Sequence, residues 1–403
     1  MNILLIARTC PVPANDGEKL RVFHLLRVMS RSHRVTLVCR VMHQDEEDAL
    51  QSLRALGIEV VGVRIAPPNG HLERLRWVAP FLLSRYPISL CTVYFPAIRD
   101  ALRQLVAHQS FDVVQIEHSS LAIYLDHLSF SNDPARVVTM HNIDYVRNER
   151  IIRNTPFGVR KWYHQLNQVR FRRWELASVR RFHRAMVMSD VDAQILRRDV
   201  PEVPVDVVPN GVDCEAMAHQ LPEIAHQSVV FVASMDSEAN NDGALHFLDA
   251  VLPLLRTRLP ELKVWMVGRQ PSAQLQARHD GQQVFVTGKV DEVVSFYRQA
   301  TVSVVPLRSG GGTRLKILEA MGLGIPVVST SVGAEGIDLR DGVDALLADT
   351  DQAFADAVHA LLTNGDRLRS ISLQARALAE HRYDWRHIGR MQEAVHVQAL
   401  ART

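Results

Sequence analysis

The chain has 403 residues, of which 47% are hydrophobic and 22% are charged, and its formal net charge is +2. This length predicts two or three domains with ample core, and a net charge so close to zero argues against a dedicated nucleic-acid-binding protein. The four cysteines are scattered without the spacing of a metal site, which is typical of free thiols in a reducing, cytoplasmic compartment.

The first forty residues predict the start of a parallel α/β sheet. The opening MNILLIA is too short for the core of a signal peptide, and no later apolar run is long enough to span a membrane. The pattern predicts a buried strand at residues 2–7, then a loop, a helix at 18–29 and a second strand at 34–39. In doubly wound sheets ligands bind beyond the carboxyl ends of the strands, where this loop lies. Gly17 in the loop is either a point where a ligand closely approaches the backbone or part of a simple turn, and both interpretations stay open.

An aromatic and apolar stretch occupies residues 71–94, after a predicted helix at 45–57 and a predicted strand at 58–65. Pro80 and Pro87 are expected to break the stretch into short helices. Such a stretch could face a lipid, but we favour buried packing because large apolar side chains are usually inside a protein.

Polar residues follow two further predicted strands, at residues 111–117 and 136–140. They are Gln115, Glu117 and His118 at the end of the first strand, and His141, Asn142 and Asp144 after the second. Polar groups at strand ends can point into a cleft. An imidazole of ordinary pKa is mostly neutral at pH 7, so His141 is suited to hydrogen bonding and orientation. A structural role, which is usual for a lone histidine at a strand end, is the alternative.

Residues 147–184 carry eleven Arg or Lys but only two acids, Glu149 and Glu175, with aromatic residues interleaved. A local charge of this size attracts phosphates or anionic lipid head groups, by roughly 1 kcal/mol per basic residue near a membrane surface. The stretch therefore predicts either a peripheral contact with an anionic membrane or one long solvated helix, and both stay open. We expect no nucleic-acid partner, because the rest of the chain has no recognition motif.

A turn at residues 209–211 marks a domain boundary near residue 208. A second parallel-sheet series follows it, and the predicted elements are strands at 228–233, 263–267 and 284–287, a helix at 242–255, and helices from about residue 350 to the end. We therefore expect a Rossmann-like domain at 1–207, a second at 208–382, and a C-terminal helix at 383–403.

The most informative segment is residues 301–338, which predicts a strand, a loop with three glycines, an amphipathic helix and a second strand at 327–330. A glycine loop that leads into a helix lets backbone N–H groups approach an anion, and the helix dipole adds to the attraction. Arg314 and Lys316 lie in the first turn of that helix, where each cation opposes the dipole by roughly 0.3 to 1 kcal/mol. This placement becomes favourable if a phosphate neutralises the two cations. The alternative is an ordinary βαβ unit whose glycines make a turn.

This segment, with about half of the chain beyond it, resembles the retaining nucleotide-sugar glycosyltransferases of family 4. The shared pattern is the glycine loop, a helix that carries the Glu of LEAM (Glu319), and the motif G-x-P-V-V at residues 324–328. The resemblance implies an α/β fold of the GT-B architecture, with two Rossmann-like domains that face each other across a cleft. It also implies that the last helix returns to the first domain.

The resemblance implies roles for individual residues. In the family the loop amides meet the donor diphosphate and the helix Glu binds the ribose hydroxyls, which assigns donor binding to Gly310, Gly311, Gly312, Thr313 and Glu319. Gly17 would face the diphosphate, and Lys289 and Val290 would contact the base. His141, in the sequence HNIDY, resembles the family's His-Asn element near the reacting side of the donor sugar.

Two departures from the family pattern matter for the site. The family often has a second Glu eight residues before the first, which touches the donor sugar, and here that position is Gly311. Many members also clamp the diphosphate with an Arg and a Lys where this chain has Ser234 and Asn241. Charge compensation is therefore expected from Arg314 and Lys316, with Arg269 as a further candidate.

The sequence thus predicts a retaining glycosyltransferase that moves a sugar from a nucleotide-diphosphate-sugar donor to a hydroxyl of a glycan or lipid-linked acceptor. His141, Arg314 and Lys316 are the predicted catalytic residues, with no metal and no cofactor. Polysaccharide or glycolipid assembly in the cytoplasm, at the inner membrane face, is the expected setting. Two alternatives stay open: a non-catalytic nucleotide-sugar-binding partner protein, and a sugar-nucleotide epimerase on the same fold.

Overall fold

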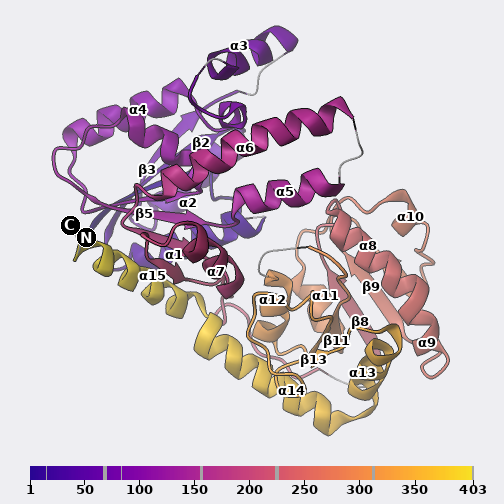
Figure 1. Cartoon of the computed structure of the whole chain (residues 1–403). Helices are drawn as coiled ribbons and strands as arrows, with labels where there is room; N and C mark the ends of the chain where they lie inside the picture. The colour runs from indigo at the N-terminus through magenta and orange to yellow at the C-terminus, as the bar shows by residue number, and fades with distance from the viewer. Residues whose placement is uncertain are drawn as a thin grey trace. The chain divides into compact units, whose positions relative to one another are not determined.

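The computed structural model describes residues 1–14, 16–66, 70–82, 84–154, 158–222, 227–310 and 314–401. The chain divides into two compact units (Figure 1): unit 1 comprises Met1–Val208 and Gly389–Thr403, and unit 2 comprises Pro209–Ile388. Within the described residues, no helix combines the length and the apolarity that crossing a lipid bilayer requires.

Unit 1 is built on a seven-stranded parallel sheet of order β3-β2-β1-β4-β5-β6-β7. Its strands are β1 (Asn2–Ala7), β2 (Arg34–Val41), β3 (Glu59–Arg64), β4 (Val113–Glu117), β5 (Ala135–Met140), β6 (Arg184–Val187) and β7 (Val205–Val207). The central strands β1, β4 and β5 are buried along almost their whole length, and most of their residues are apolar on both faces of the sheet. Gln115 and Glu117 of β4 and Thr139 of β5 are buried polar exceptions. The chain reverses its direction of travel across the sheet between β1 and β4. In doubly wound sheets, ligands bind beyond the carboxyl ends of the strands at such a reversal.

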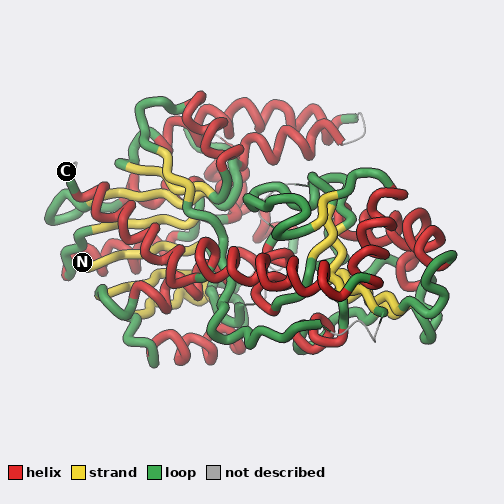
Figure 2. The backbone as a smooth tube through the Cα atoms, turned by 90° about the horizontal axis from the view of Figure 1, so that it is seen from below, coloured by secondary structure: helices red, strands yellow, loops and turns green. Residues whose placement is uncertain are grey.

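Helices cover both faces of this sheet (Figure 2). They are α1 (Gly17–Met29), α2 (Gln44–Arg54), α3 (His71–Leu82), η1 (Ile88–Thr92), α4 (Pro96–His108), η2 (Ser119–His127), α5 (Asp144–Asn154), α6 (Val159–Val179) and α7 (Asp190–Asp199). The last helix of the chain, α15 (Trp385–Leu400), packs against α1 through its unit 1 part, where Gly389 lies directly against Val28. The absence of a side chain at Gly389 lets the two helices approach closely.

Two predictions about the helices of unit 1 are wrong. Pro80 lies inside α3 and cannot donate a backbone hydrogen bond to the preceding turn, yet the helix continues to Leu82. The basic stretch 147–184 is not one long helix, because it forms α5 and α6, with Gly158 in an extended conformation just before α6. Within the aromatic stretch, Phe81 is buried as expected, whereas Leu82 is 49% exposed.

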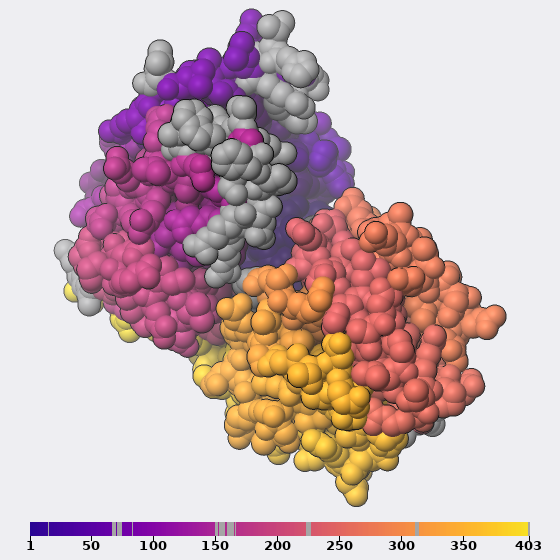
Figure 3. Space-filling view, turned by 45° about the vertical axis from the view of Figure 1, so that its right-hand side comes forward, coloured from indigo at the N-terminus to yellow at the C-terminus, as the bar shows by residue number. Residues whose placement is uncertain are grey.

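Unit 2 is built on a six-stranded parallel sheet of order β10-β9-β8-β11-β12-β13. Its strands are β8 (Ser228–Val232), β9 (Lys263–Val267), β10 (Val284–Val286), β11 (Val302–Val305), β12 (Val327–Ser329) and β13 (Leu346–Leu347). The direction reverses between β8 and β11, so residues from early and late in the unit become neighbours. Figure 3 shows this on one surface of unit 2, where the early part (red) and the late part (orange to yellow) lie side by side.

The helices of unit 2 are α8 (Glu238–His246), α9 (Leu252–Arg256), α10 (Ala273–Gln276), α11 (Val294–Gln299), α12 (Leu315–Leu323), α13 (Asp351–Thr363) and α14 (Gly365–Leu378). The helix predicted at 242–255 is divided by a π-helical turn at Phe247–Val251. Pro253 follows this turn and cannot donate a backbone hydrogen bond, so it sits in the first turn of α9.

Candidate active site

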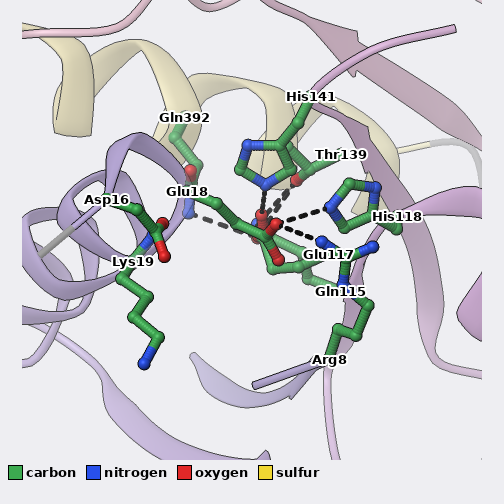
Figure 4. A network of polar contacts seen from close by, with 10 residues as sticks. All are labelled: Arg8, Asp16, Glu18, Lys19, Gln115, Glu117, His118, Thr139, His141 and Gln392. Carbon is green, nitrogen blue, oxygen red and sulfur yellow. Dashed lines mark hydrogen bonds and ion pairs between the residues drawn. The ribbon is translucent and has the colours of Figure 1, made fainter. Parts of the chain in front are cut away.

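Polar side chains gather at the carboxyl ends of β4 and β5 in unit 1 (Figure 4). Glu117 of β4 and Thr139 of β5 are partners in the sheet register. His141 directly follows β5, and its Nε2 lies 2.7 Å from Glu117 Oε2. The imidazole also stacks on His118, with ring centroids 4.8 Å apart and an interplanar angle of 29°. The structure therefore brings together four of the six polar residues named from the sequence, Gln115, Glu117, His118 and His141. Asp144 instead lies near Glu175.

The Glu117 carboxylate is held by three side chains. Gln115 Nε2 and Thr139 Oγ1 donate to Glu117 Oε1 at 2.6 and 3.1 Å, while His141 Nε2 contacts the other oxygen. Burial opposes ionisation, yet the hydrogen bond from His141 and the charge of Arg21 bring the pKa of Glu117 below its ordinary value. Glu117 is therefore an ionised acceptor at neutral pH.

The protonation of His141 follows from the same contacts. Burial lowers the pKa of His141, although the hydrogen bond to Glu117 opposes this, so the ring is neutral at pH 7. A neutral imidazole has one N–H, and an ionised Glu117 requires that the proton be on Nε2. The Nδ1 atom is then an acceptor, which suits it to bind a hydroxyl.

Glu18 of α1 extends this cluster. Its Oε2 lies 2.7 Å from the Arg8 guanidinium and 3.1 Å from His118 Nε2. Burial opposes ionisation of Glu18, but the hydrogen bond and charge of His118 and the charge of Arg8 lower its pKa to about 2. Gly17 is the first residue of α1 and is exposed, beside Asp16, whose side chain caps the helix by accepting from Lys19 N at 2.9 Å. Gly17, which the sequence placed in a loop, is therefore the residue next to Glu18 in the cluster of Glu18, Arg8 and His118.

His118 has an unusual backbone. Its φ angle is 103°, a left-handed conformation that costs a non-glycine residue about 1–3 kcal/mol. The conformation is held because His118 N donates to Thr139 O at 2.8 Å, and the ring is buried between Glu18 and His141. Strain of this kind concentrates at functional sites, and here it fixes the ring against His141.

In unit 2, the candidate site begins where β11 leads into α12. Gly310 has φ of 122°, and a side chain there would lie 2.9 Å from the Arg314 guanidinium, so only glycine fits. Arg314 occupies the N-cap position of α12. The predicted donor-binding residues Gly311, Gly312 and Thr313 lie outside the described residues.

Lys316 lies in the first turn of α12, partly buried. Its Nζ donates to Asn240 Oδ1 at 2.8 Å and sits 4.6 Å from the centre of the Phe231 ring. Both partners are neutral, and burial together with the positive charge of Arg314 lowers the pKa of Lys316 to about 7. Asn240 in turn donates to Ser234 O at 2.8 Å, so the loop after β8 contacts the start of α12.

Glu319 lies on α12 after Lys316. Its Oε2 is 3.5 Å from the Tyr297 hydroxyl, which also donates to Lys316 O at 3.1 Å. Burial raises the pKa of Glu319 to about 7, against the opposing charge of Lys316. Lysine and glutamate are thus both displaced towards their neutral forms at pH 7.

The remaining predicted site residues follow β9 and β10. Arg269 Nε donates to Ser234 Oγ at 2.7 Å, and its guanidinium is 3.7 Å from Asp236, so it contacts the loop between β8 and α8. Lys289 is exposed, and Val290 packs partly buried against the core of unit 2.

Several site residues were missed by the sequence predictions. Asn240 accepts a hydrogen bond from Lys316, whereas the neighbouring Asn241 accepts from Ser272 N at 3.4 Å. The residue at the start of α8 that contacts Lys316 is therefore one position earlier than the family pattern indicates. Glu18 and Arg8 had no sequence signal beyond their place near the first strand. Among the described residues, no three His, Cys, Asp or Glu side chains are grouped so that they could hold a metal ion.

Two protein-family models match the chain. The model described as Glycosyltransferase Family 4 matches residues 17–216, and the model described as Glycosyl transferases group 1 matches residues 226–364. Together they match well over half of the chain. A phosphatidyl-myo-inositol mannosyltransferase of Mycobacterium tuberculosis is 27% identical over 405 residues, which cover 94% of this chain and 93% of that protein.

Solved structures of the same fold cover the whole chain. Sucrose-phosphate synthase from Thermosynechococcus elongatus covers 100% of both chains, with 16% identity and a TM-score of 0.71. Anabaena HepE in complex with UDP and glucose covers 98% of this chain and 99% of its own, with 16% identity and a TM-score of 0.67. At these identities the likeness concerns the fold.

Proposed function

Since this chain belongs to the family 4 and group 1 glycosyltransferases and has the GT-B fold, we propose that it transfers a sugar from a nucleotide-diphosphate-sugar to a hydroxyl with retention. The observation that carries this proposal is the start of α12, where Arg314 and Lys316 follow three glycines in the sequence and where, among the described residues, the hydrogen-bonding and ring partners of Lys316 are the neutral Asn240 and Phe231. A diphosphate bound there would neutralise both cations and accept from the helix N-terminus. The Anabaena structure, which was solved with UDP and glucose, supports this class of donor.

We assign the parts of the donor to the residues that the structure describes. The diphosphate is proposed to bind Arg314 and Lys316 with a contribution from Arg269, and the ribose hydroxyls to bind Glu319. A carboxyl group whose pKa is about 7 can accept from a hydroxyl when ionised and also donate when protonated. The base lies against Lys289 and Val290.

The reaction balances as follows. The bond between the anomeric carbon and the diphosphate oxygen breaks, and its electron pair stays on the diphosphate, which gains negative charge. A new bond forms between the same carbon and the acceptor oxygen, whose proton passes to the leaving phosphate on the same face of the sugar. Each fixed cation or N–H aimed at the leaving group lowers the barrier by about 2.7–4 kcal/mol, by analogy with an oxyanion hole. Two side-chain cations can supply this stabilisation, so we propose that no metal is required and that a chelator leaves the activity unchanged.

His141 is proposed to orient the sugar. Its Nε2–H is committed to Glu117, so Nδ1 accepts a hydrogen bond from a sugar hydroxyl. A neutral ring serves this role better than a charged one, and burial keeps His141 neutral at pH 7.

The acceptor is proposed to be a glycan or a lipid-linked hydroxyl. The mycobacterial relative is named as a phosphatidyl-myo-inositol mannosyltransferase, which supports polysaccharide or glycolipid assembly. Peripheral contact with an anionic membrane through residues 147–184 remains part of the proposal. Several of these basic side chains are engaged within unit 1, for example Arg172 with Asp199 and Arg184 with Asp206. The positive charge that this surface can offer to a membrane is therefore smaller than the number of Arg and Lys residues in 147–184 indicates.

One alternative function has an observation in its favour. Ser234 and Asn241 occupy the positions where the family pattern has an Arg and a Lys, and neither side chain carries a positive charge. Ser234 instead accepts from Arg269, and Asn241 accepts from Ser272 N. A non-catalytic nucleotide-sugar-binding protein would have such a weakened clamp.

The experiment has two steps. Calorimetry with UDP, TDP, GDP and ADP first identifies the nucleotide, and release of that nucleotide from its sugar conjugates is then measured with and without acceptor hydroxyls. Acceptor-dependent release supports the transferase. Binding of one nucleotide without release on any acceptor would identify the non-catalytic binder, and interconversion of the sugar without transfer would identify an epimerase.

A further inference from the structure

Three buried polar side chains lie between α15 and the Glu117–His141 pair. Gln115 of β4 and Gln392 and His396 of α15 are each 0% exposed. Polar groups so deep in a protein are costly unless they are hydrogen-bonded, and an apolar side chain would be the ordinary choice at such positions. Their presence on a strand and on the last helix of the chain therefore calls for a physical reason.

The Gln115 amide links the helix to the catalytic pair (Figure 4). Its Oε1 accepts from His396 Nε2 at 2.6 Å and from Gln392 Nε2 at 3.2 Å. Its Nε2 donates to Glu117 Oε1 at 2.6 Å and to Thr139 Oγ1 at 3.0 Å. Both lone pairs of the carbonyl and both protons of the amino group are thus used.

The two donors of α15 and the ionised Glu117 favour the same orientation of the Gln115 amide. Burial lowers the pKa of His396 to about 4, so at pH 7 its ring is neutral and its single proton is on Nε2, facing Gln115. If the amide were reversed, its carbonyl oxygen would face the ionised Glu117, and its amino group would face two N–H donors. With His396 and Gln392 in place, the amino group points at Glu117.

We propose that Gln115, Gln392 and His396 are positioning residues for sugar transfer, because they hold Glu117 in the orientation that fixes His141. The chain of contacts runs from α15 through Gln115 to Glu117 Oε1, while Glu117 Oε2 receives the proton of His141 Nε2. The catalytic consequence rests on the proposed function, whereas the effect on the His141 ring does not.

We call the hydrogen-bonded chain from His396 and Gln392 through Gln115 to Glu117 and His141 the relay. Other charged or titratable groups also face it. Arg21 and Glu18 of α1 and His118 after β4 act on the Glu117–His141 pair, and His33 acts on His396. The substitutions chosen below leave all of these residues in place, so a change at His141 reports on the relay.

The test compares His396→Leu with His396→Gln. Glutamine places an N–H donor at nearly the same reach as His Nε2, whereas leucine keeps the site apolar and removes the donor. Gln392→Leu removes the second donor of α15 and serves as an independent variant if His396→Leu does not fold. Val395→Ala, a buried residue of α15 outside the relay, is the packing control.

The His141 imidazole is followed by nitrogen NMR during a pH titration, without any ligand. His396→Leu is expected to raise the titration midpoint of His141, because Gln115 loses a donor that holds its carbonyl, its N–H···Glu117 hydrogen bond weakens, and the negative potential at the ring becomes stronger. His396→Gln and Val395→Ala are expected to keep the wild-type midpoint. On the donor and acceptor that the wild type turns over, kcat should fall by about 10- to 100-fold in His396→Leu, as for other groups that orient a functional side chain, and recover in His396→Gln.

An unchanged His141 midpoint in both His396→Leu and Gln392→Leu would overturn the proposal, whatever their activity. An equal loss of kcat in His396→Gln and His396→Leu would also overturn it, because loss of packing and not of the donor would then be the cause. A wild-type protein that transfers no sugar refutes the proposed function alone, since the NMR titration still decides the relay.

Discussion

The two polar clusters balance their charges in opposite ways. In unit 1, the pKa values of Glu117 and Glu18 lie below their ordinary values, because each buried carboxylate has several donors around it. In unit 2, burial is the largest effect on both groups: it lowers the pKa of Lys316 to about 7 and raises the pKa of Glu319 to about 7. The carboxylates of the first cluster are thus stabilised in their ionised forms by donors of the chain itself, whereas Lys316 and Glu319 of the second are both shifted towards their neutral forms. This difference supports the proposal that the anionic part of the donor binds at the start of α12.

The largest expected effect is on turnover in unit 2. Lys316→Ala or Arg314→Ala should lower kcat by about 10²–10³-fold, because each removes a cation that stabilises charge developing on the leaving diphosphate. The melting temperature should not fall in Lys316→Ala, since the substitution removes a partly buried charge whose hydrogen-bonding partner is neutral. Kinetics on the donor found in the nucleotide screen and thermal unfolding measure the two effects.

Lys263→Ala and Arg298→Ala are matched controls for these variants. Both residues are exposed, and they lie outside the proposed site. If Lys316→Ala and Arg314→Ala turn over as fast as these controls, the diphosphate clamp is assigned to the wrong residues.

In unit 1, Glu117→Gln should show the opposite balance between activity and stability. An amide cannot accept from Gln115, Thr139 and His141 together, so we expect kcat to fall by about 10- to 100-fold. Removing the carboxylate also deprives buried Arg21 of an attractive charge, and loss of a buried charge partner costs about 3–5 kcal/mol at most. Chemical denaturation measures the loss. If Glu117→Gln were as stable as the wild type, the predicted difference between the unit 1 carboxylates, which stabilise the fold, and Lys316, which does not, would be contradicted.

The smallest expected effect is a pH dependence of nucleoside diphosphate binding. Lys316 is half-protonated near pH 7 in the free protein, and a bound diphosphate raises its pKa, so binding takes up a proton. Affinity should therefore weaken as pH rises from 7 to 9, by at most about tenfold per pH unit. Calorimetry with the nucleotide from the screen, in buffers of different ionisation enthalpy, measures the proton uptake. Lys316→Ala should flatten the profile, and a wild-type profile that is already flat would mean that the anion does not contact Lys316.

Local signals were enough to predict most of the fold. The apolar runs of the parallel strands predicted β1 and β9 closely and β4 to within two residues, because strands buried on both faces are mostly apolar. The glycines after β11 and the helix pattern behind them likewise predicted α12. Two helix predictions failed at single residues: α3 continues past Pro80 to Leu82, and an extended Gly158 precedes α6.

The candidate site was predictable only in part. His141 and Lys316 stood out because each belongs to a motif, and Gln115 and Glu117 because polar residues at the end of an apolar strand are unusual. Gln392 and His396 gave no such signal, since a polar residue on an amphipathic C-terminal helix is ordinary in sequence. Only the packing of α15 beside α1 shows that they are buried.

The sequence by itself determined the two parallel sheets, the glycine loop before α12 and the family to which the chain belongs. These follow from residue order, through hydrophobic pattern, turn residues and motif spacing. The tertiary structure alone decided which groups are charged and which atom of each side chain is free to bind. Protonation depends on burial and on neighbours far away in the sequence, as with Lys316 beside Asn240, Glu18 beside His118, and Gln115 between Glu117 and His396.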